Sequence, residues 1–255
     1  MPLKGILLDL DNTLYDYETA HKPALAAAVQ YLSGATGFEP GTIGDAYGKA
    51  RAQINQQLSG QAASHSRLLY FQRVHELLDL PGYETVLEAE ETYWRTFLEC
   101  MSLRPGVTEF LDSLGNAVVV GIISDLTAQI QFRKLVKLKL ERRFRAIVTS
   151  EESGAEKPRP EIFQIALAKL GITSGAACVI GDSWERDIIG GVQLGMHCYW
   201  LTPELSSASA SGASQAELDG RINSLPPDAG KLVVRVCSFD ELSRLISAQM
   251  AQGVQ

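Results

Sequence analysis

Two aspartates with one residue between them, Asp9 and Asp11, stand directly after an apolar run over residues 5–8. The run is short and bounded by polar residues, which is typical of a buried strand. Neighbouring carboxylates repel each other unless a cation or a shared proton intervenes, and the hard ion Mg²⁺ prefers oxygen ligands. The pair therefore indicates a metal-dependent site. The structural alternative is an Asp-Asn turn in which Asp11 and Asn12 cap backbone groups.

Two further polar segments have the composition of an anion site. Ser124 and Asp125 follow a β-branched run over residues 117–123, so a hydroxyl and the N–H groups of a strand-to-helix turn can bind an anion, or merely cap the helix. Lys157 is followed by Pro158, which holds the lysine extended and gives its side chain a definite direction. The alternative for Lys157 is a solvated surface position, the usual fate of a lysine.

A fourth polar segment runs from Gly181 through Asp182 and Ser183 to Asp187, after an apolar run over residues 178–180. At the end of a strand, Asp182 can join the first aspartate pair. Asp187 can complete the cluster directly, through water or by orienting its neighbours. The alternative is again a helix cap at Asp182 or Ser183.

The elements that must position these residues alternate between strand and helix. We predict strands at 5–8, 117–123, 146–148, 178–180, 198–201 and 232–236, with helices at about 107–114, 127–140, 160–170, 186–194 and 239–250. This order indicates an α/β fold with a parallel sheet and right-handed crossovers. Ligands bind at the carboxyl ends of such strands, where all four polar segments begin.

Residues 16–102 carry helical patterns and no strand signal, which predicts an all-helical domain inserted into a core of residues 1–15 and 103–255. His21, His65 and His75 of this insertion could contact a substrate, but we expect them to be solvated helix positions, and we expect His197 to be structural. Residues 203–229 are rich in Ser, Ala, Gly and Pro, and 206–212 have the composition of a flexible surface loop.

Composition excludes several classes of function. The chain has 255 residues, 45% of them hydrophobic, and a net charge of −7 without a block of like charge, so neither nucleic acid nor an anionic membrane surface is an expected partner. No apolar run approaches the roughly 20 residues of a membrane-spanning helix. The start leaves no room for a signal peptide, and four scattered cysteines are expected as buried free thiols, which favours the cytoplasm. The oligomeric state cannot be predicted.

Taken in order, the four segments resemble the motifs of the haloacid-dehalogenase-like superfamily of hydrolases, in particular its phosphatase branch. Residues 9–13 resemble the first motif, Ser124 the second, Lys157 with Pro158 the third, and Gly181 through Asp187 the fourth. The resemblance covers residues 1–15 and about 103–201. It implies a Rossmann-like core, and by position it makes the helical insertion the cap that these enzymes carry.

The resemblance also implies roles for the site residues. Asp9 would be the nucleophile that forms an aspartyl-phosphate, and Asp11 the general acid and then base. Mg²⁺ would be held by Asp9, the backbone carbonyl of Asp11 and Asp182, with Asp187 in support. Three groups would bind the phosphoryl group: the Ser124 hydroxyl, the Lys157 ammonium, and the backbone N–H groups near Leu10, Asp11 and Asp125. Thr13 would brace the loop.

The chain departs from the family pattern in three places, one of which is the greater length of residues 203–229 between the last core strands. Asp125 stands where Asn or Gly is frequent, and a carboxylate there is unfavourable for phosphate unless it points away. The predicted helix over 127–140 ends in Leu138, Lys139 and Leu140, where a glycine is common. The departure at Asp125 bears on the substrate and leaves the class of reaction unchanged.

The favoured hypothesis is a Mg²⁺-dependent phosphomonoesterase that acts on a small soluble phosphorylated metabolite, closed over by the cap. One alternative is a haloacid dehalogenase, which Asp11 argues against because a leaving halide needs no proton donor. A phosphomutase is a second alternative. A catalytically silent binding module is the third, and it is disfavoured because such proteins usually lose one of the site residues that this chain retains.

Overall fold

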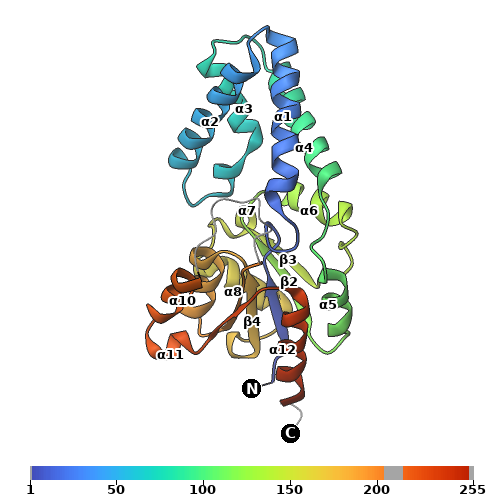
Figure 1. Cartoon of the computed structure of the whole chain (residues 1–255), viewed down its shortest axis with the longest axis vertical. Coiled ribbons are helices and arrows are strands. Elements are labelled where there is room, and N and C mark those ends of the chain that lie inside the picture. The colour runs from blue at the N-terminus through green and yellow to red at the C-terminus, as the bar shows by residue number, and fades with distance from the viewer. Residues whose placement is uncertain (1, 204–214, 253–255) are drawn as a thin grey trace.

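The computed structural model describes residues 2–203 and 215–252 and contains one parallel sheet with helices on both faces (Figure 1). The predicted α/β class with a Rossmann-like parallel sheet is confirmed. The strands are β1 Gly5–Leu8, β2 Val119–Ser124, β3 Ala146–Thr149, β4 Ala177–Gly181, β5 His197–Leu201 and β6 Val233–Val236. Each predicted strand agrees with an observed one to within two residues at either end.

The sheet order β3-β2-β1-β4-β5-β6 places β1 at the centre, with β2 and β4 as its parallel neighbours. The chain winds away from β1 in opposite directions on its two sides, so the strand order reverses beside β1. In open α/β sheets such a reversal opens a crevice at the carboxyl ends of the strands. The first, second and fourth polar segments leave β1, β2 and β4 at this crevice.

The core is divided between the two faces of the sheet because side chains alternate along each strand. Ile6 and Leu8 point to one face, where they join a cluster with Phe110 of helix α5 (Val107–Leu114) and with helix α12 (Phe239–Gln252). Leu7 points to the other face and packs in a second cluster with Phe163 of helix α8 (Pro160–Leu170). Burial on both faces explains why the strands are continuous apolar runs.

The helices around the sheet agree with the predicted ones except at their ends, at α7 and in the last third of the chain. Helix α6 ends three residues earlier than predicted, and the helix predicted over 186–194 is a π-helical turn, η3, followed by a short α-helix. The bounds are α5 Val107–Leu114, α6 Ala128–Lys137, α7 Ser150–Ser153, α8 Pro160–Leu170, η2 Ser174–Ala176, η3 Trp184–Ile188, α9 Ile189–Gln193, α10 Gln215–Asn223, α11 Pro227–Gly230 and α12 Phe239–Gln252. Helices α7, α10 and α11 were not predicted.

The insertion between β1 and β2 is helical, and in Figure 1 it lies beyond the carboxyl ends of the strands. Helix α1 packs along α4, and α2 packs against α3. The bounds are α1 Tyr17–Thr36, α2 Pro40–Gln57, η1 Ala62–His65, α3 Arg67–Leu77 and α4 Glu84–Cys100.

The expected solvation of the insertion's histidines is wrong for two of the three. His21 and His75 are 6% and 4% exposed, and His65 is half-buried. His21 Nδ1 lies 2.7 Å from the Tyr93 hydroxyl, and His75 hydrogen-bonds Thr85 and the carbonyl of Phe71. Each imidazole is buried because a polar partner from the same helical group satisfies it, a pairing that sequence periodicity does not reveal.

The cysteine and loop predictions have mixed outcomes. Cys178 and Cys198 are buried free thiols, Cys237 is half-buried, and Cys100, expected to be buried, is exposed at the end of α4. Residues 206–212, predicted as a surface loop, lie outside the described residues. Within the described ranges, no helix combines the length and apolarity that crossing a bilayer requires.

Candidate active site

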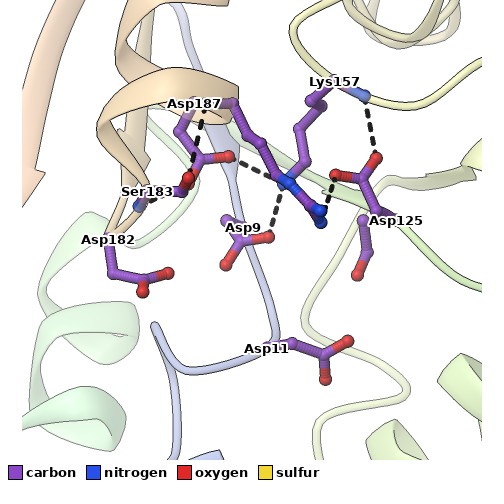
Figure 2. Close-up of a pocket in the computed structure, with 9 residues that line it drawn as sticks. Asp9, Asp11, Asp125, Lys157, Asp182, Ser183 and Asp187 are labelled. Carbon is purple, nitrogen blue, oxygen red and sulfur yellow. Dashed lines mark hydrogen bonds and ion pairs between the residues drawn. The ribbon is translucent and has the colours of Figure 1, made fainter. Parts of the chain in front are cut away.

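All four polar segments meet in one pocket of about 200 Å³ at the carboxyl edge of the sheet. The loop after β1, the loop after β2, the segment before α8 and the turn after β4 each contribute to its wall (Figure 2). The lining residues are Asp9, Asp11, Ser124, Asp125, Lys157, Asp182, Ser183, Arg186 and Asp187.

Lys157 lies between two carboxylates in the interior of this pocket (Figure 2). Its Nζ is 2.6 Å from Asp9 Oδ1 and 2.7 Å from Asp187 Oδ1, and all three side chains are nearly inaccessible to solvent. Lys157 is therefore not the solvated lysine of the structural alternative. Asp187, followed by Asp9, raises the pKa of Lys157 well above its usual value in spite of burial, so the ammonium stays charged.

Thr13 connects Asp9 with Asp182. Its hydroxyl lies 2.7 Å from Asp9 Oδ2 and 3.1 Å from Asp182 Oδ1, and it accepts a hydrogen bond from the Asp182 N–H at 3.1 Å. Asn12 Nδ2 donates to the other oxygen of Asp182 at 2.7 Å. The loop after β1 and the turn after β4 thus hold each other in place through side chains 169 and 170 positions apart.

Gly181 allows Asp187 to approach the end of β4. A Cβ at position 181 would lie 2.3 Å from Asp187 Oδ2, far inside van der Waals contact. Asp187 Oδ2 also accepts the Ser183 N–H at 3.0 Å, while Oδ1 contacts Lys157. Both oxygens of Asp187 are thus engaged by the protein, which indicates that its contribution is to orient Lys157 and the turn.

Asp11 is surrounded by donors that the sequence analysis did not identify. Lys134 Nζ donates to Oδ1 at 2.6 Å, Gln131 Nε2 donates to Oδ2 at 2.7 Å, and the Tyr15 hydroxyl also donates to Oδ1. Burial alone would raise the pKa of Asp11, but Lys134 and the other donors outweigh it and lower that pKa. Gln131 and Lys134 are three residues apart on the helix that follows Ser124, but this ordinary helical spacing does not show that their face meets Asp11.

Ser124 and Asp125 reach the pocket from the end of β2. The Ser124 hydroxyl is fully buried and accepts from Gln131 Nε2 at 2.6 Å. The Asp125 carboxylate accepts a hydrogen bond from the Lys157 backbone N–H at 2.9 Å and forms an ion pair with Arg186 at 3.4 Å. The predicted conflict between Asp125 and an anion is therefore reduced, because a guanidinium and a backbone N–H offset its charge.

Asp9, Asp182 and Asp187 form a carboxylate cluster whose oxygens lie within 4.8 Å of one another. Burial, with the charge of Asp187, raises the pKa of Asp9 to about 7, although Lys157 acts in the opposite direction. Burial and then Asp9 raise the pKa of Asp182 to about 6. The cluster carries more negative charge than its one lysine offsets, so a divalent cation with oxygen ligands fits it.

The fold and this pocket define an α/β enzyme whose site lies at the topological switch point of a parallel sheet. The family model described as haloacid dehalogenase-like hydrolase matches residues 6–201. The chain belongs to this family and, as the following relatives support, to its phosphatase branch.

Two curated relatives are phosphatases. The chain is 34% identical to ribulose-1,5-bisphosphate 5-phosphatase of Halopiger xanaduensis over 215 residues, which is 83% of this chain and 90% of the relative. It is 30% identical to glyceraldehyde 3-phosphate phosphatase of Methanothermobacter thermautotrophicus over 220 residues, which is 85% of this chain and 93% of the relative.

Solved structures support the fold. The crystal structure of a 2-haloacid dehalogenase from Pseudomonas syringae pv. Tomato superposes with a TM-score of 0.71 at 22% identity, covering 96% of this chain and 99% of that one. At this identity the likeness establishes a shared architecture and carries no information on the reaction.

Proposed function

We propose that the protein is a Mg²⁺-dependent phosphomonoesterase that acts on a small phosphorylated metabolite through an aspartyl-phosphate on Asp9. The observation that carries the proposal is the position of a second carboxylate, Asp11, beside Asp9 and Lys157 in one pocket. A nucleophile, a proton carrier and a cation for the phosphoryl group are the three parts that this reaction requires.

In the first step, an Asp9 oxygen attacks phosphorus and the ester P–O bond breaks on the opposite side. The electron pair of that bond leaves on the substrate oxygen, which takes a proton from Asp11. Asp11 carries this proton because a bound phosphate anion beside it favours the neutral carboxyl over the carboxylate. Lys157, the Ser124 hydroxyl and backbone N–H groups at Leu10, Asp11 and Asp125 bind the phosphoryl oxygens.

In the second step, Asp11 accepts a proton from water as the water oxygen attacks phosphorus. The bond between phosphorus and Asp9 breaks, which releases inorganic phosphate and restores the Asp9 carboxylate. The three donors around Asp11 favour its ionised form and so suit the base role. Thr13 and Asp187 are positioning residues, because they hold Asp9, Asp182 and Lys157 in place.

The cation would be held by Asp9 and Asp182, the backbone carbonyl of Asp11 and, in support, Asp187. When bound, Mg²⁺ lowers the repulsion between the Asp9 carboxylate and the phosphate and stabilises charge on the phosphoryl oxygens. Without it, the raised pKa of Asp9 favours a protonated and poorly nucleophilic carboxyl.

Residues 16–102 would act as the cap on a core of residues 1–15 and 103–255. The support is their position beyond the carboxyl edge of the sheet, where closure excludes water from the reaction (Figure 1). Ribulose bisphosphate and glyceraldehyde 3-phosphate, named for the two relatives, are phosphorylated sugars. We therefore propose a phosphorylated sugar as the substrate. A cytoplasmic location and the absence of nucleic-acid and membrane partners stay predictions.

The proposal is tested by phosphate release from a panel of sugar phosphates, nucleoside monophosphates and phosphoglycolate, with Mg²⁺ and with chelator. We expect Mg²⁺-dependent release confined to one chemical class. Asp9→Asn is expected to lower turnover by about 10⁴-fold or more with an unchanged circular dichroism spectrum. Asp45→Asn, an exposed carboxylate on α2, is the matched control. Rapid acid quench with ³²P-labelled substrate should leave hydroxylamine-sensitive label on the wild type alone.

The alternatives give different outcomes. Chloride release from a 2-haloacid without phosphate release would establish a dehalogenase. Transfer of phosphate between positions of one sugar, without net release, would establish a phosphomutase. No reaction with any ester, together with no label on Asp9, would identify a binding module. Normal turnover by Asp9→Asn would overturn the mechanism.

A further inference from the structure

A second pocket, of about 270 Å³, adjoins the first on the side of the helical insertion. The two pockets share Asp11, Asp125 and Arg186, so a molecule at Asp9 can extend from one into the other. The remaining wall includes Arg51 of α2 and Arg67 at the first position of α3. Both residues belong to the insertion, beyond the edge of the sheet.

Arg67 is a buried guanidinium without a carboxylate partner. It is 7% exposed, and across residues 2–203 and 215–252 it forms no ion pair. Nη1 donates to the His65 carbonyl at 2.6 Å, Nη2 donates to the Tyr17 hydroxyl, and the buried Nε has no hydrogen-bond partner. Aromatic rings surround it, with Tyr70 and Trp94 centred 5.3 and 5.4 Å from Cζ. Buried charges are normally paired, so this one lacks an anion.

The other basic side chains of the second pocket have acidic partners. Lys134 is paired with Asp11 at 2.6 Å, and Arg186 with Asp125 at 3.4 Å. His65 Nε2 lies 3.0 Å from Glu156. Arg51 is exposed at the pocket and, within the described part of the chain, forms no ion pair. The excess positive charge of the pocket therefore resides on two arginines, Arg51 and Arg67.

We propose that Arg51 and Arg67 form a subsite for a second phosphate group of the substrate, so that the preferred substrate is a small sugar bisphosphate. This inference rests on the proposed function, because the phosphate that is removed must bind at Asp9. Two planar guanidinium forks match the oxygens and charge of a phosphate dianion. A neutral sugar hydroxyl would leave the buried charge of Arg67 without a counter-ion.

The test compares matched pairs of substrates. We expect kcat/KM for ribulose 1,5-bisphosphate to exceed that for ribulose 5-phosphate by about tenfold or more, since a hydrogen bond to a charged group contributes roughly that factor. Phosphoglycolate carries a carboxylate in place of the second phosphate, so it distinguishes a subsite for phosphate from a subsite for carboxylate. Arg51→Gln is expected to lower the ratio of bisphosphate to monophosphate kcat/KM by about tenfold.

Lys49→Gln is the control, because it removes the same charge from an exposed position two residues away on another side of α2. It should leave the ratio unchanged. Arg67→Met should lower the ratio further. If Arg67→Met does not fold, Arg51→Gln still decides the question, because Arg51 is exposed and its replacement leaves the buried contacts intact.

Binding to the inactive Asp9→Asn variant, measured by calorimetry, separates the two proposals. Hydrolysis of both sugars with equal kcat/KM and equal affinity would overturn the second subsite and leave the phosphatase intact. Preference for phosphoglycolate over the bisphosphate would show that the subsite binds a carboxylate, and it would overturn the assignment to a second phosphate. No hydrolysis of any ester, with tight binding of the bisphosphate, would overturn the phosphatase and retain the subsite. No binding of the bisphosphate would overturn the subsite.

Discussion

The ammonium of Lys134 lies 2.6 Å from the carboxylate of Asp11, although 123 positions separate the two residues in the chain. Lys134 is 1% exposed and lies over the rings of Trp94 and Phe97 at 5.6 and 5.5 Å. Those rings belong to α4, whereas Asp11 belongs to the loop after β1. The pair therefore lies where the helical insertion meets the sheet, and it connects the proposed acid–base residue to both parts.

Replacing Lys134 by methionine is expected to lower kcat by about 10- to 100-fold, part of the usual contribution of a general acid–base group. Lys134 lowers the pKa of Asp11, so its loss raises that pKa. The base role needs an ionised Asp11, and the acidic limb of the kcat–pH profile should therefore move to higher pH. Lys137→Met, at an exposed position one turn along α6, is the control. A profile that is lower but unshifted would assign Lys134 a purely structural role.

A methyl group at position 181 is expected to disrupt the site by displacing Asp187. The Cβ of Gly181→Ala would lie 2.3 Å from Asp187 Oδ2 and 2.6 Å from Asp187 Cβ, so the turn after β4 must move. We expect unfolding to become easier by about 1–3 kcal/mol, as in other overpacked sites, with a loss of activity beyond that explained by the unfolded fraction.

Urea unfolding and phosphate release measured in parallel check this expectation. Gly48→Ala is the matched control, because a Cβ at that exposed position of α2 meets no atom within 4 Å. The control should stabilise the protein by about 0.5–1 kcal/mol, since alanine is the better helix former. Wild-type stability and activity for Gly181→Ala would show that the close packing of Asp187 is dispensable.

The sheet and the site edge were predictable because each left a local signal. Buried parallel strands are unbroken apolar runs, and the polar residues that end them reach the site by topology alone. The contacts around Asp11 were not predictable in the same way. Lys134 and Gln131 follow an ordinary helical pattern, and only the folded chain shows that their face points at Asp11. The burial of His21 depends likewise on Tyr93, 72 positions away.

The departure from the family pattern at residues 138–140 has a conformational consequence at Lys139. Lys139 follows the end of α6 with a φ of 58°, in the left-handed region that glycine adopts without strain. Its side chain is exposed, so no packing is lost on its removal. We expect Lys139→Gly to stabilise the protein by about 0.5–1 kcal/mol. The substitution removes the strain of a left-handed residue, and the greater entropy of glycine in the unfolded chain offsets part of that gain.

Thermal unfolding checks this expectation, because in a chain of this size each kcal/mol of stabilisation raises the Tm by about 2–4 °C. Lys49→Gly, at an exposed position in the interior of α2, should instead destabilise by about 0.5–1 kcal/mol, because glycine weakens a helix interior. Equal losses from both substitutions would mean that the backbone at Lys139 is not strained.

Stability should fall as pH rises when no divalent cation is present. Burial and neighbouring carboxylates raise the pKa values of Asp9 to about 7 and of Asp182 to about 6, from a usual value of 3.8. Between the usual pKa and the raised pKa of each group, the folded protein binds more protons than the unfolded chain. The free energy of unfolding therefore decreases as pH rises across that interval. We expect the Tm in chelator to be lower at about pH 8 than at about pH 5.

Mg²⁺ should oppose this loss, because at the proposed site it would bind the ionised carboxylates of the folded chain, and a ligand at a hundredfold excess over its Kd stabilises by about 2.7 kcal/mol. Its effect on Tm should be larger at about pH 8 than at about pH 5, since protons compete with the metal for the same oxygens. Asp182→Asn should flatten the pH dependence in chelator and weaken the response to Mg²⁺. A Tm in chelator that rises over this interval would show that Asp9 and Asp182 are ionised without the metal. An equal Mg²⁺ shift of Tm at both pH values would show that their cluster is not the metal site.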